Sequence, residues 1–129
     1  MLRLPVPLAP LLATTALLGA CSDGAAPCPP TALVAAVDVE IRAAGTDAPL
    51  ATAARGAIRD GSYLDSLVPG RSVGGTLISR RAGFQRPGTY TVTVVVPGYA
   101  TWEQTGVVAH QGSCTVEPVS VQATLAVSP

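Results

Sequence analysis

Two segments of the chain alternate apolar and polar residues with a period of two, and this alternation constrains the fold more than any other feature. Residues 37–43, VDVEIRA, and residues 86–100, RPGTYTVTVVVPGYA, carry it most clearly. Successive side chains of a β-strand point to opposite faces, so each segment predicts a strand with one buried face. The positions expected to face inward here and near the end of the chain are Val37, Val39, Ile41, Tyr90, Val92, Val94, Val96, Val119, Val121, Ala123 and Leu125.

Shorter segments, separated by turn signals, extend this pattern along the chain. Glycine, proline or Asp-Gly pairs bound the segments 51–58, 62–68, 101–110 and 114–125. The first of these, ATAARGAI, is ambiguous because alanine favours a helix. A strand is expected there nevertheless, because Gly56 interrupts the segment and an Asp-Gly turn signal soon follows it. No segment predicts a convincing helix, so we expect an all-β sandwich or small barrel.

An uncharged, mostly apolar run, residues 4–20, follows Arg3 and ends at Cys21. A charged start followed by a short apolar run is typical of a secretory signal. A transmembrane helix needs about 20 apolar residues, and three prolines in the run disfavour a stable helix. One interpretation is therefore an ordinary signal peptide that is cut after a small residue.

The end of that run, Leu18-Gly19-Ala20-Cys21, resembles the lipobox of bacterial lipoproteins. The resemblance implies cleavage before Cys21, acylation of its thiol and of its new amine, and anchoring to a membrane through lipid. Two or more acyl chains hold a protein stably at a bilayer. Ser22 is not the aspartate that retains enteric lipoproteins at the inner membrane, so the outer membrane is favoured over the inner one.

Three parts follow from these boundaries: a signal peptide at residues 1–20, a tether at residues 21–31 and a β-sandwich domain at residues 32–127. Removal of the signal leaves 109 residues, which suit one modest domain. The chain contains no lysine, and its mature part carries seven arginines against eight acidic residues. This near-neutral balance gives no reason to expect nucleic-acid binding.

Cys28 and Cys114 are the two cysteines that remain once Cys21 is assigned to lipid. An even pair in an oxidising compartment predicts a disulfide, which would join the end of the tether to the last strand. A pair of free buried thiols is the alternative. A zinc site is not expected, because His110 is distant and the clustered ligand spacing of known sites is absent. No metal and no cofactor is expected.

Four stretches of the sequence together resemble the carboxypeptidase regulatory-like domain. They are VDVEIRAAGTDAPL, DGSY, PGTYTVTVVVPGYATW and VSVQATL, and the resemblance covers about residues 34–126. It implies a transthyretin-like, seven-stranded antiparallel β-sandwich that serves as a non-catalytic accessory to other proteins. Residues 68–86 are longer and more basic than the compact pattern of that family, so strand pairing is least defined there.

One short motif suggests hydrolase chemistry. Residues 70–74 match G-x-S-x-G, and Ser72, Glu103 and His110 follow the order of nucleophile, acid and base in α/β-hydrolases. We reject this assignment, because the motif needs a strand-to-helix turn in a parallel α/β sheet and the chain offers no such helix. Asp60 and Asp65 could flank a calcium ion, but the alternating oxygen donors of a calcium loop are absent and a solvated turn is favoured.

Two groups of side chains are candidates for binding. Tyr99 and Trp102 could stack on a sugar ring, although packing beneath a strand end is the favoured interpretation. Four arginines lie in an acid-free segment and could contact an anionic glycolipid or an acidic partner; they are Arg71, Arg80, Arg81 and Arg86. The alternative is that these charges on an exposed edge only discourage aggregation.

The sequence therefore predicts a lipid-anchored, non-catalytic module of the cell envelope. We expect it to serve protein interaction or structural support, with the membrane and an envelope protein or glycan as partners. A carbohydrate-binding module at the cell surface is the alternative, and an enzyme is not expected.

Overall fold

A computed structural model describes residues 5, 28–29 and 32–129 of the chain. Apart from Pro5, the signal peptide expected at residues 1–20 lies outside the described residues, and so does Cys21. Among the residues that are described, no helix is long and apolar enough to cross a membrane.

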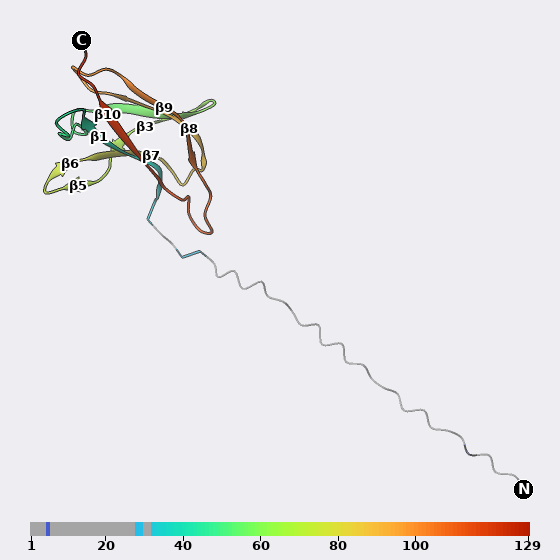
Figure 1. Ribbon diagram of the computed structural model, residues 1–129. Helices are drawn as coiled ribbons and strands as arrows, with labels where there is room; N and C mark the ends of the chain where they lie inside the picture. The colour runs from blue at the N-terminus through green and yellow to red at the C-terminus, as the bar shows by residue number, and fades with distance from the viewer. Residues whose placement is uncertain (1–4, 6–27, 30–31) are drawn as a thin grey trace, which may run out of the picture.

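Strands make up all the regular secondary structure that the structure describes, as the alternating pattern predicts (Figure 1). They are β1 (Ala35–Ala43), β2 (Arg55–Asp60), β3 (Tyr63–Ser66), β4 (Val68–Pro69), β5 (Ser72–Val73), β6 (Thr76–Leu77), β7 (Ser79–Phe84), β8 (Gly88–Val95), β9 (Trp102–Ala109) and β10 (Val119–Leu125). One four-stranded sheet has the order β10-β1-β7-β4, a second has the order β3-β2-β8-β9, and β5 pairs with β6 in a separate hairpin.

The hydrophobic core lies between the two four-stranded sheets and takes side chains from both. Its largest fully buried side chains include Ile41 of β1 and Tyr90 of β8. The expected alternation is confirmed in β1 and β8, where every inward position named from the sequence is buried. In β10 the residues Val121, Ala123 and Leu125 are buried, and Val119 packs against the core while partly exposed.

The expectation of seven strands is wrong: the described residues form ten strands in three sheets. The additional strands are β4, β5 and β6, each of two residues, and all three fall within residues 68–86, where the sequence departs from the compact family pattern. Gly74 and Gly75 both have positive φ and form the turn between β5 and β6. Left-handed backbone is accessible to glycine, so this glycine pair lets the chain reverse in a short hairpin.

The expectation of a purely antiparallel sandwich is also wrong, because β1 and β10 pair in parallel. Val37 lies opposite Val119 at one end of the pair and Ala43 lies opposite Leu125 at the other. Residues 110–118 carry the chain from the end of β9 in the second sheet to the start of β10 in the first sheet. β10 therefore begins beside the start of β1 and runs in the same direction.

The strand expected at residues 51–58 forms only in part. Residues 51–53 form a turn, and β2 begins at Arg55. Ala51 at the start of the turn and Ala54 just after it are buried, while Thr52 and Ala53 between them are exposed. Ala51 and Ala54 therefore fill the end of the core instead of extending a helix or a strand.

The strand directions give the sandwich two distinct ends. The tether end comprises the start of β1, the β7–β8 turn and residues 110–118; the free end comprises residues 44–54 and 96–101. A disulfide joins Cys28 to Cys114 at the tether end, with the Cα atoms 5.2 Å apart. The predicted disulfide is thus confirmed, and the alternative of two free thiols is wrong.

Candidate functional site

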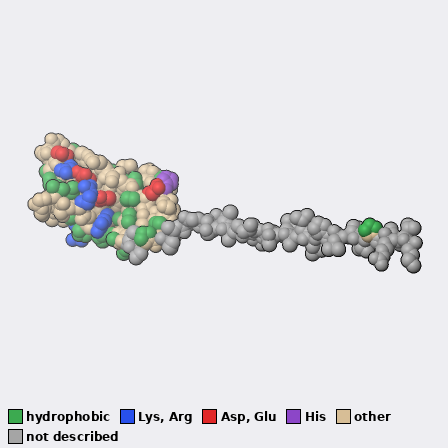
Figure 2. Space-filling view, turned by 90° about the horizontal axis from the view of Figure 1, so that it is seen from below, with side chains coloured by type: hydrophobic (Ala, Val, Ile, Leu, Met, Phe, Trp, Pro, Cys, Tyr) green, Lys and Arg blue, Asp and Glu red, His purple; other side chains and the backbone are tan. Residues whose placement is uncertain are grey.

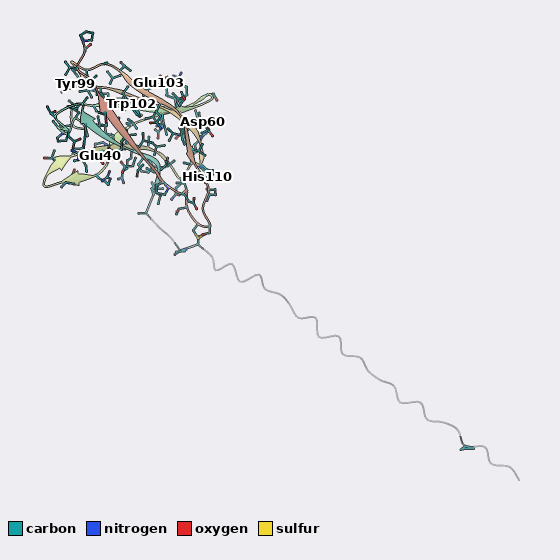
Figure 3. The ribbon with its side chains drawn as sticks, viewed as in Figure 1. Glu40, Asp60, Tyr99, Trp102, Glu103 and His110 are labelled. Atoms are coloured by element: carbon teal, nitrogen blue, oxygen red, sulfur yellow. A yellow bond between two sulfur atoms is a disulfide. The ribbon has the colours of Figure 1, made fainter. Side chains whose placement is uncertain are left out.

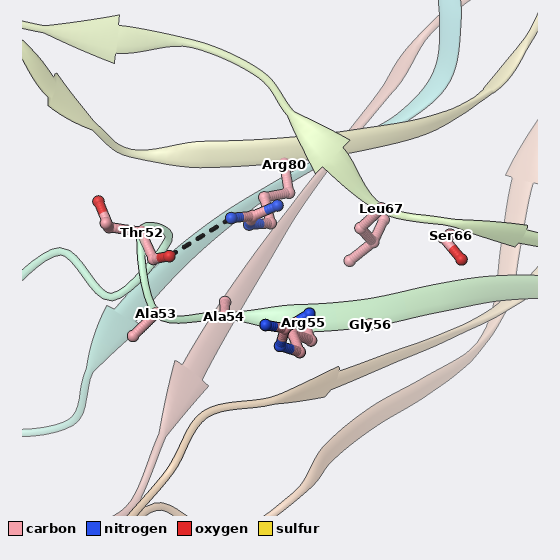
Figure 4. A pocket seen from close by; sticks show the side chains of 8 residues that line it. All are labelled: Thr52, Ala53, Ala54, Arg55, Gly56, Ser66, Leu67 and Arg80. Carbon is pink, nitrogen blue, oxygen red and sulfur yellow. Dashed lines mark hydrogen bonds between the residues drawn. The ribbon is translucent and has the colours of Figure 1, made fainter.

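A polar hollow lies at the free end, where the chain crosses from β3 of one sheet to β4 of the other (Figure 4). We call it the free-end pocket. It has a volume of about 430 Å³ and is lined by Thr52, Ala53, Ala54, Arg55, Gly56, Ser66, Leu67 and Arg80. Both sheets contribute to the lining, because Arg80 belongs to β7 and the neighbouring arginine begins β2.

Arg80 occupies a register position that points toward the interior. It lies opposite Val39 of β1, which is fully buried, and directly opposed residues of an antiparallel pair share a face. The Nε of Arg80 donates a hydrogen bond of 2.7 Å to the carbonyl oxygen of Ala51. One Nη donates to the carbonyl oxygen of Thr52 at 3.4 Å, the contact drawn in Figure 4. The turn at residues 51–53 thus fixes the direction of the Arg80 guanidinium.

Arg55 lines the same pocket from the start of β2 and is exposed. The next residue, Gly56, must be glycine, because a Cβ at that position would overlap the carbonyl oxygen of Thr93 and lie 2.9 Å from a methyl carbon of Leu67. The backbone N–H of Leu67 also donates to the carbonyl oxygen of Gly56 at 2.9 Å. Glycine therefore allows the close approach that shapes this side of the pocket.

The two pocket arginines are not neutralised by an acid. None of the eight lining residues is acidic, and neither Arg55 nor Arg80 forms an ion pair with a described carboxylate. The partners of Arg80 are carbonyl oxygens, which accept hydrogen bonds without cancelling its charge. The pocket therefore has a net positive charge.

Arg71, by contrast, is paired with acids on the outer face of β1. Its Nε lies 2.8 Å from Asp38 and one Nη lies 3.5 Å from Glu40. The hydrogen bond to Asp38 is the main cause that raises the pKa of Arg71. Arg42 joins the group, because its Nε donates a hydrogen bond of 2.6 Å to the Oε1 of Glu40. This hydrogen bond is the main cause that lowers the pKa of Glu40. Figure 2 shows arginine and acidic side chains intermixed along one face.

Arg86 is paired at the tether end. Its guanidinium carbon lies 3.8 Å from the ring centroid of Tyr63, and an Nη lies 3.1 Å from Asp60. The same Nη donates to the hydroxyl oxygen of Tyr90 at 3.2 Å, and that hydroxyl donates to the carbonyl oxygen of Arg86. Burial is the main cause that raises the pKa of Tyr63. This cluster holds the β7–β8 turn against the second sheet.

Arg81 points away from its neighbour Arg80. It lies opposite Asp38, on the outer face of the first sheet, and its guanidinium carbon is 5.5 Å from the ring centroid of Phe84. The four arginines singled out in the sequence therefore do not share one surface. Arg71 and Arg81 lie on the outer face of the first sheet, Arg80 at the free end and Arg86 at the tether end.

The two aromatic residues considered for sugar binding both pack against the core while partly exposed. Trp102 lies opposite Val94, a fully buried residue, so it is on the inner face of the second sheet. Tyr99 pairs with Val127 through an isolated bridge. Figure 3 shows both at the free end. Packing against the core, rather than an open stacking platform, describes their positions.

The residues of the G-x-S-x-G order are not brought together. Glu103 lies near the start of β9 and His110 follows its last residue, and Figure 3 shows this separation. Ser72 lies on the separate β5–β6 hairpin. Gly70 in the motif has a packing role, because a Cβ there would lie 2.5 Å from the hydroxyl of the buried Ser79.

The two aspartates considered for calcium are both engaged by the fold. Asp60 pairs with Arg86, and Asp65 accepts a hydrogen bond of 2.9 Å from the backbone N–H of Gly83. Among the described residues, no group of three or more metal-ligating side chains forms.

Sequence reasoning missed Arg55 as part of a site. It stands among alanines and outside the acid-free segment, so neither charge density nor a motif marks it. The turn at residues 51–53, which the sequence did not predict, brings it to the pocket that holds Arg80.

No protein-family model matches the chain, and no curated protein matches it.

Proposed function

We propose that this protein is a lipid-anchored, non-catalytic β-sandwich module of the cell envelope that binds a protein partner. The observation that carries the proposal is the disulfide between Cys28 and Cys114. Cys28 lies seven residues after Cys21, the cysteine of the proposed lipobox. Disulfides persist in oxidising compartments, which agrees with export through the apolar N-terminal run. Because the bridge lies at the tether end, a lipid at Cys21 would leave the free end directed away from the membrane.

A binding role agrees better with the side-chain contacts than a catalytic role does. The carboxylates Asp38, Asp60 and Asp65 are each engaged by an arginine or a backbone N–H that holds the fold. Acid–base catalysis needs such groups free to reach a substrate proton. Carbohydrate binding has less support, because Tyr99 and Trp102 pack against the core.

The carboxypeptidase regulatory-like domain remains our proposal for the family. The two-layered all-β architecture supports it. The parallel β1–β10 pair and the short strands β4 to β6 differ from the seven-stranded antiparallel pattern of that family. Domains of that kind are non-catalytic accessories, which is in keeping with the proposed role.

Site-specific photocrosslinking in intact cells tests the proposed role. A photoreactive phenylalanine analogue at Thr52 reports on the free end, and the same analogue at Glu117 reports on the tether end. We expect a discrete protein adduct from position 52 and none of the same mass from position 117. Equal labelling from both positions, or no protein adduct from position 52, would contradict a partner-binding role for the free end.

A further inference from the structure

The free-end pocket carries two positive charges that the fold does not balance. Arg80 is half-buried in a position that faces the interior, and Arg55 stands beside it at the start of β2. Removing a charge from water is unfavourable unless an opposite charge or hydrogen-bonding partners compensate for it. Arg42, Arg71 and Arg86 each have a carboxylate within 4 Å, whereas the partly buried Arg80 has only carbonyl partners. An anion in the pocket would therefore find two arginine charges that no described carboxylate neutralises.

The guanidinium of Arg80 is held in one direction and keeps unused donors. A guanidinium has five N–H donors, and Arg80 uses its Nε and one Nη on the carbonyl oxygens of Ala51 and Thr52. The remaining Nη donors are available to an acceptor. A planar guanidinium fork of this kind matches the two oxygens of a carboxylate or a phosphate.

The rest of the lining suits the same ligand. Thr52 and Ser66 add hydroxyl-bearing residues to the lining, and no lining side chain is acidic. The volume of about 430 Å³ falls within the range of small-molecule sites and exceeds what a single ion needs. It leaves room for part of the molecule that carries the anionic group.

We propose that the free-end pocket binds an oxyanion group, a carboxylate or a phosphate, held by Arg80 and Arg55. The inference rests on the proposed function only in taking the free end as the surface that meets a partner. A second hollow, of about 370 Å³ on the outer face of the second sheet, does not share this chemistry, because Glu103 lines it together with Arg59.

The test is a titration of the purified full chain in non-ionic detergent, followed by two-dimensional ¹H–¹⁵N NMR. Inorganic phosphate and acetate serve as two probes, and chloride at the same ionic strength corrects for screening. We expect saturable shifts of the backbone amide signals of Gly56 and Ser66 with at least one oxyanion and none with chloride. The tighter of the two probes identifies the source of the anionic group as a phosphate or a carboxylate.

Matched variants locate the binding. Arg55→Gln and Arg80→Gln are each expected to weaken oxyanion binding by about tenfold or more, since each removes a charged hydrogen-bond donor. Arg59→Gln and Arg81→Gln remove the same charge from positions outside the pocket and are expected to leave binding within about twofold. Equal weakening by all four variants would assign the effect to net charge and overturn the proposal.

Arg80 also holds the β1–β2 turn, so its replacement by glutamine can disturb the fold. Arg80→Lys keeps the charge but loses the planar guanidinium that bonds to Ala51 and Thr52. Arg55→Gln removes a side chain that has no described ion pair. Loss of saturable binding in Arg55→Gln, with unchanged chemical shifts elsewhere, supports the site. The absence of saturable shifts in the parent chain with both oxyanions would overturn it.

This experiment separates the two proposals. Oxyanion binding is measured on the purified chain and requires neither an acyl group nor a partner. A chain that binds phosphate but lacks acylation would contradict the proposed anchoring alone, while an acylated chain that binds neither probe would contradict the pocket alone.

Discussion

The guanidinium of Arg86 stacks on the ring of Tyr63, with 3.8 Å between the guanidinium carbon and the ring centroid, and the same side chain pairs with Asp60 at 3.1 Å. These contacts join the β7–β8 turn of the tether end to β2 and β3. We predict that Arg86→Gln lowers the urea midpoint of unfolding, because it removes both the ion pair and the cation–π contact. Arg59→Gln is the matched control, and an equal midpoint for the two variants would show that the Arg86 cluster adds nothing.

The disulfide at the tether end is expected to stabilise the domain substantially. It joins residues that are 86 positions apart, so it restricts a long loop in the unfolded chain. Replacing Cys28 and Cys114 together by serine should reduce the free energy of unfolding by about 2–4 kcal/mol. Urea unfolding with and without reductant measures this, and a parent protein indifferent to reductant would contradict the prediction.

Gly56 sets the approach of β2 to β8, and its replacement tests that packing. Gly56→Ala should destabilise the fold by about 1–3 kcal/mol, because the added Cβ would overlap the carbonyl oxygen of Thr93. Gly45→Ala is a useful comparison, since Gly45 has a φ of 83° but a Cβ added there would meet no atom within 4 Å. We expect the larger loss at Gly56, and the reverse order in thermal unfolding would contradict close packing there.

Acid should weaken the contact between Glu40 and Arg42. The pKa of Glu40 is lowered in the folded state, chiefly by the hydrogen bond from Arg42. A lowered folded-state pKa adds stability above the unfolded-state value, near 4.5, and that stability is lost as the pH falls through the folded-state value. Arg42→Gln should therefore destabilise the protein at pH 7 more than at pH 3. A pH-independent difference in urea midpoint would refute this assignment.

Residues with regular alternation allowed the core to be predicted from the sequence. In β1 and β8 every second side chain is apolar, and one buried face is the only arrangement that removes this set from water. The disulfide was predictable for a different reason. The chain has three cysteines, and the predicted use of Cys21 for lipid left Cys28 and Cys114 as the pair.

The pairing of distant segments could not be predicted in the same way. The parallel β1–β10 pair depends on the path of residues 110–118 around the tether end, and no local pattern encodes that path. The site was missed for a similar reason. Arg80 and Arg81 are neighbours in sequence, but strand alternation sends them to opposite faces, and the partner of Arg80 in the pocket comes from β2.

The central claim is that the domain is held at a membrane by lipid on Cys21, and acyl labelling tests it most directly. Cells expressing the parent chain or Cys21→Ala are grown with a radiolabelled or clickable fatty acid, and the protein is then isolated and partitioned between detergent and water. Cys28→Ala, which retains Cys21, controls for loss of a thiol. Acyl label and detergent partitioning should be present in the parent and in Cys28→Ala and absent from Cys21→Ala. Label that persists in Cys21→Ala, or a parent chain without label, would contradict the account.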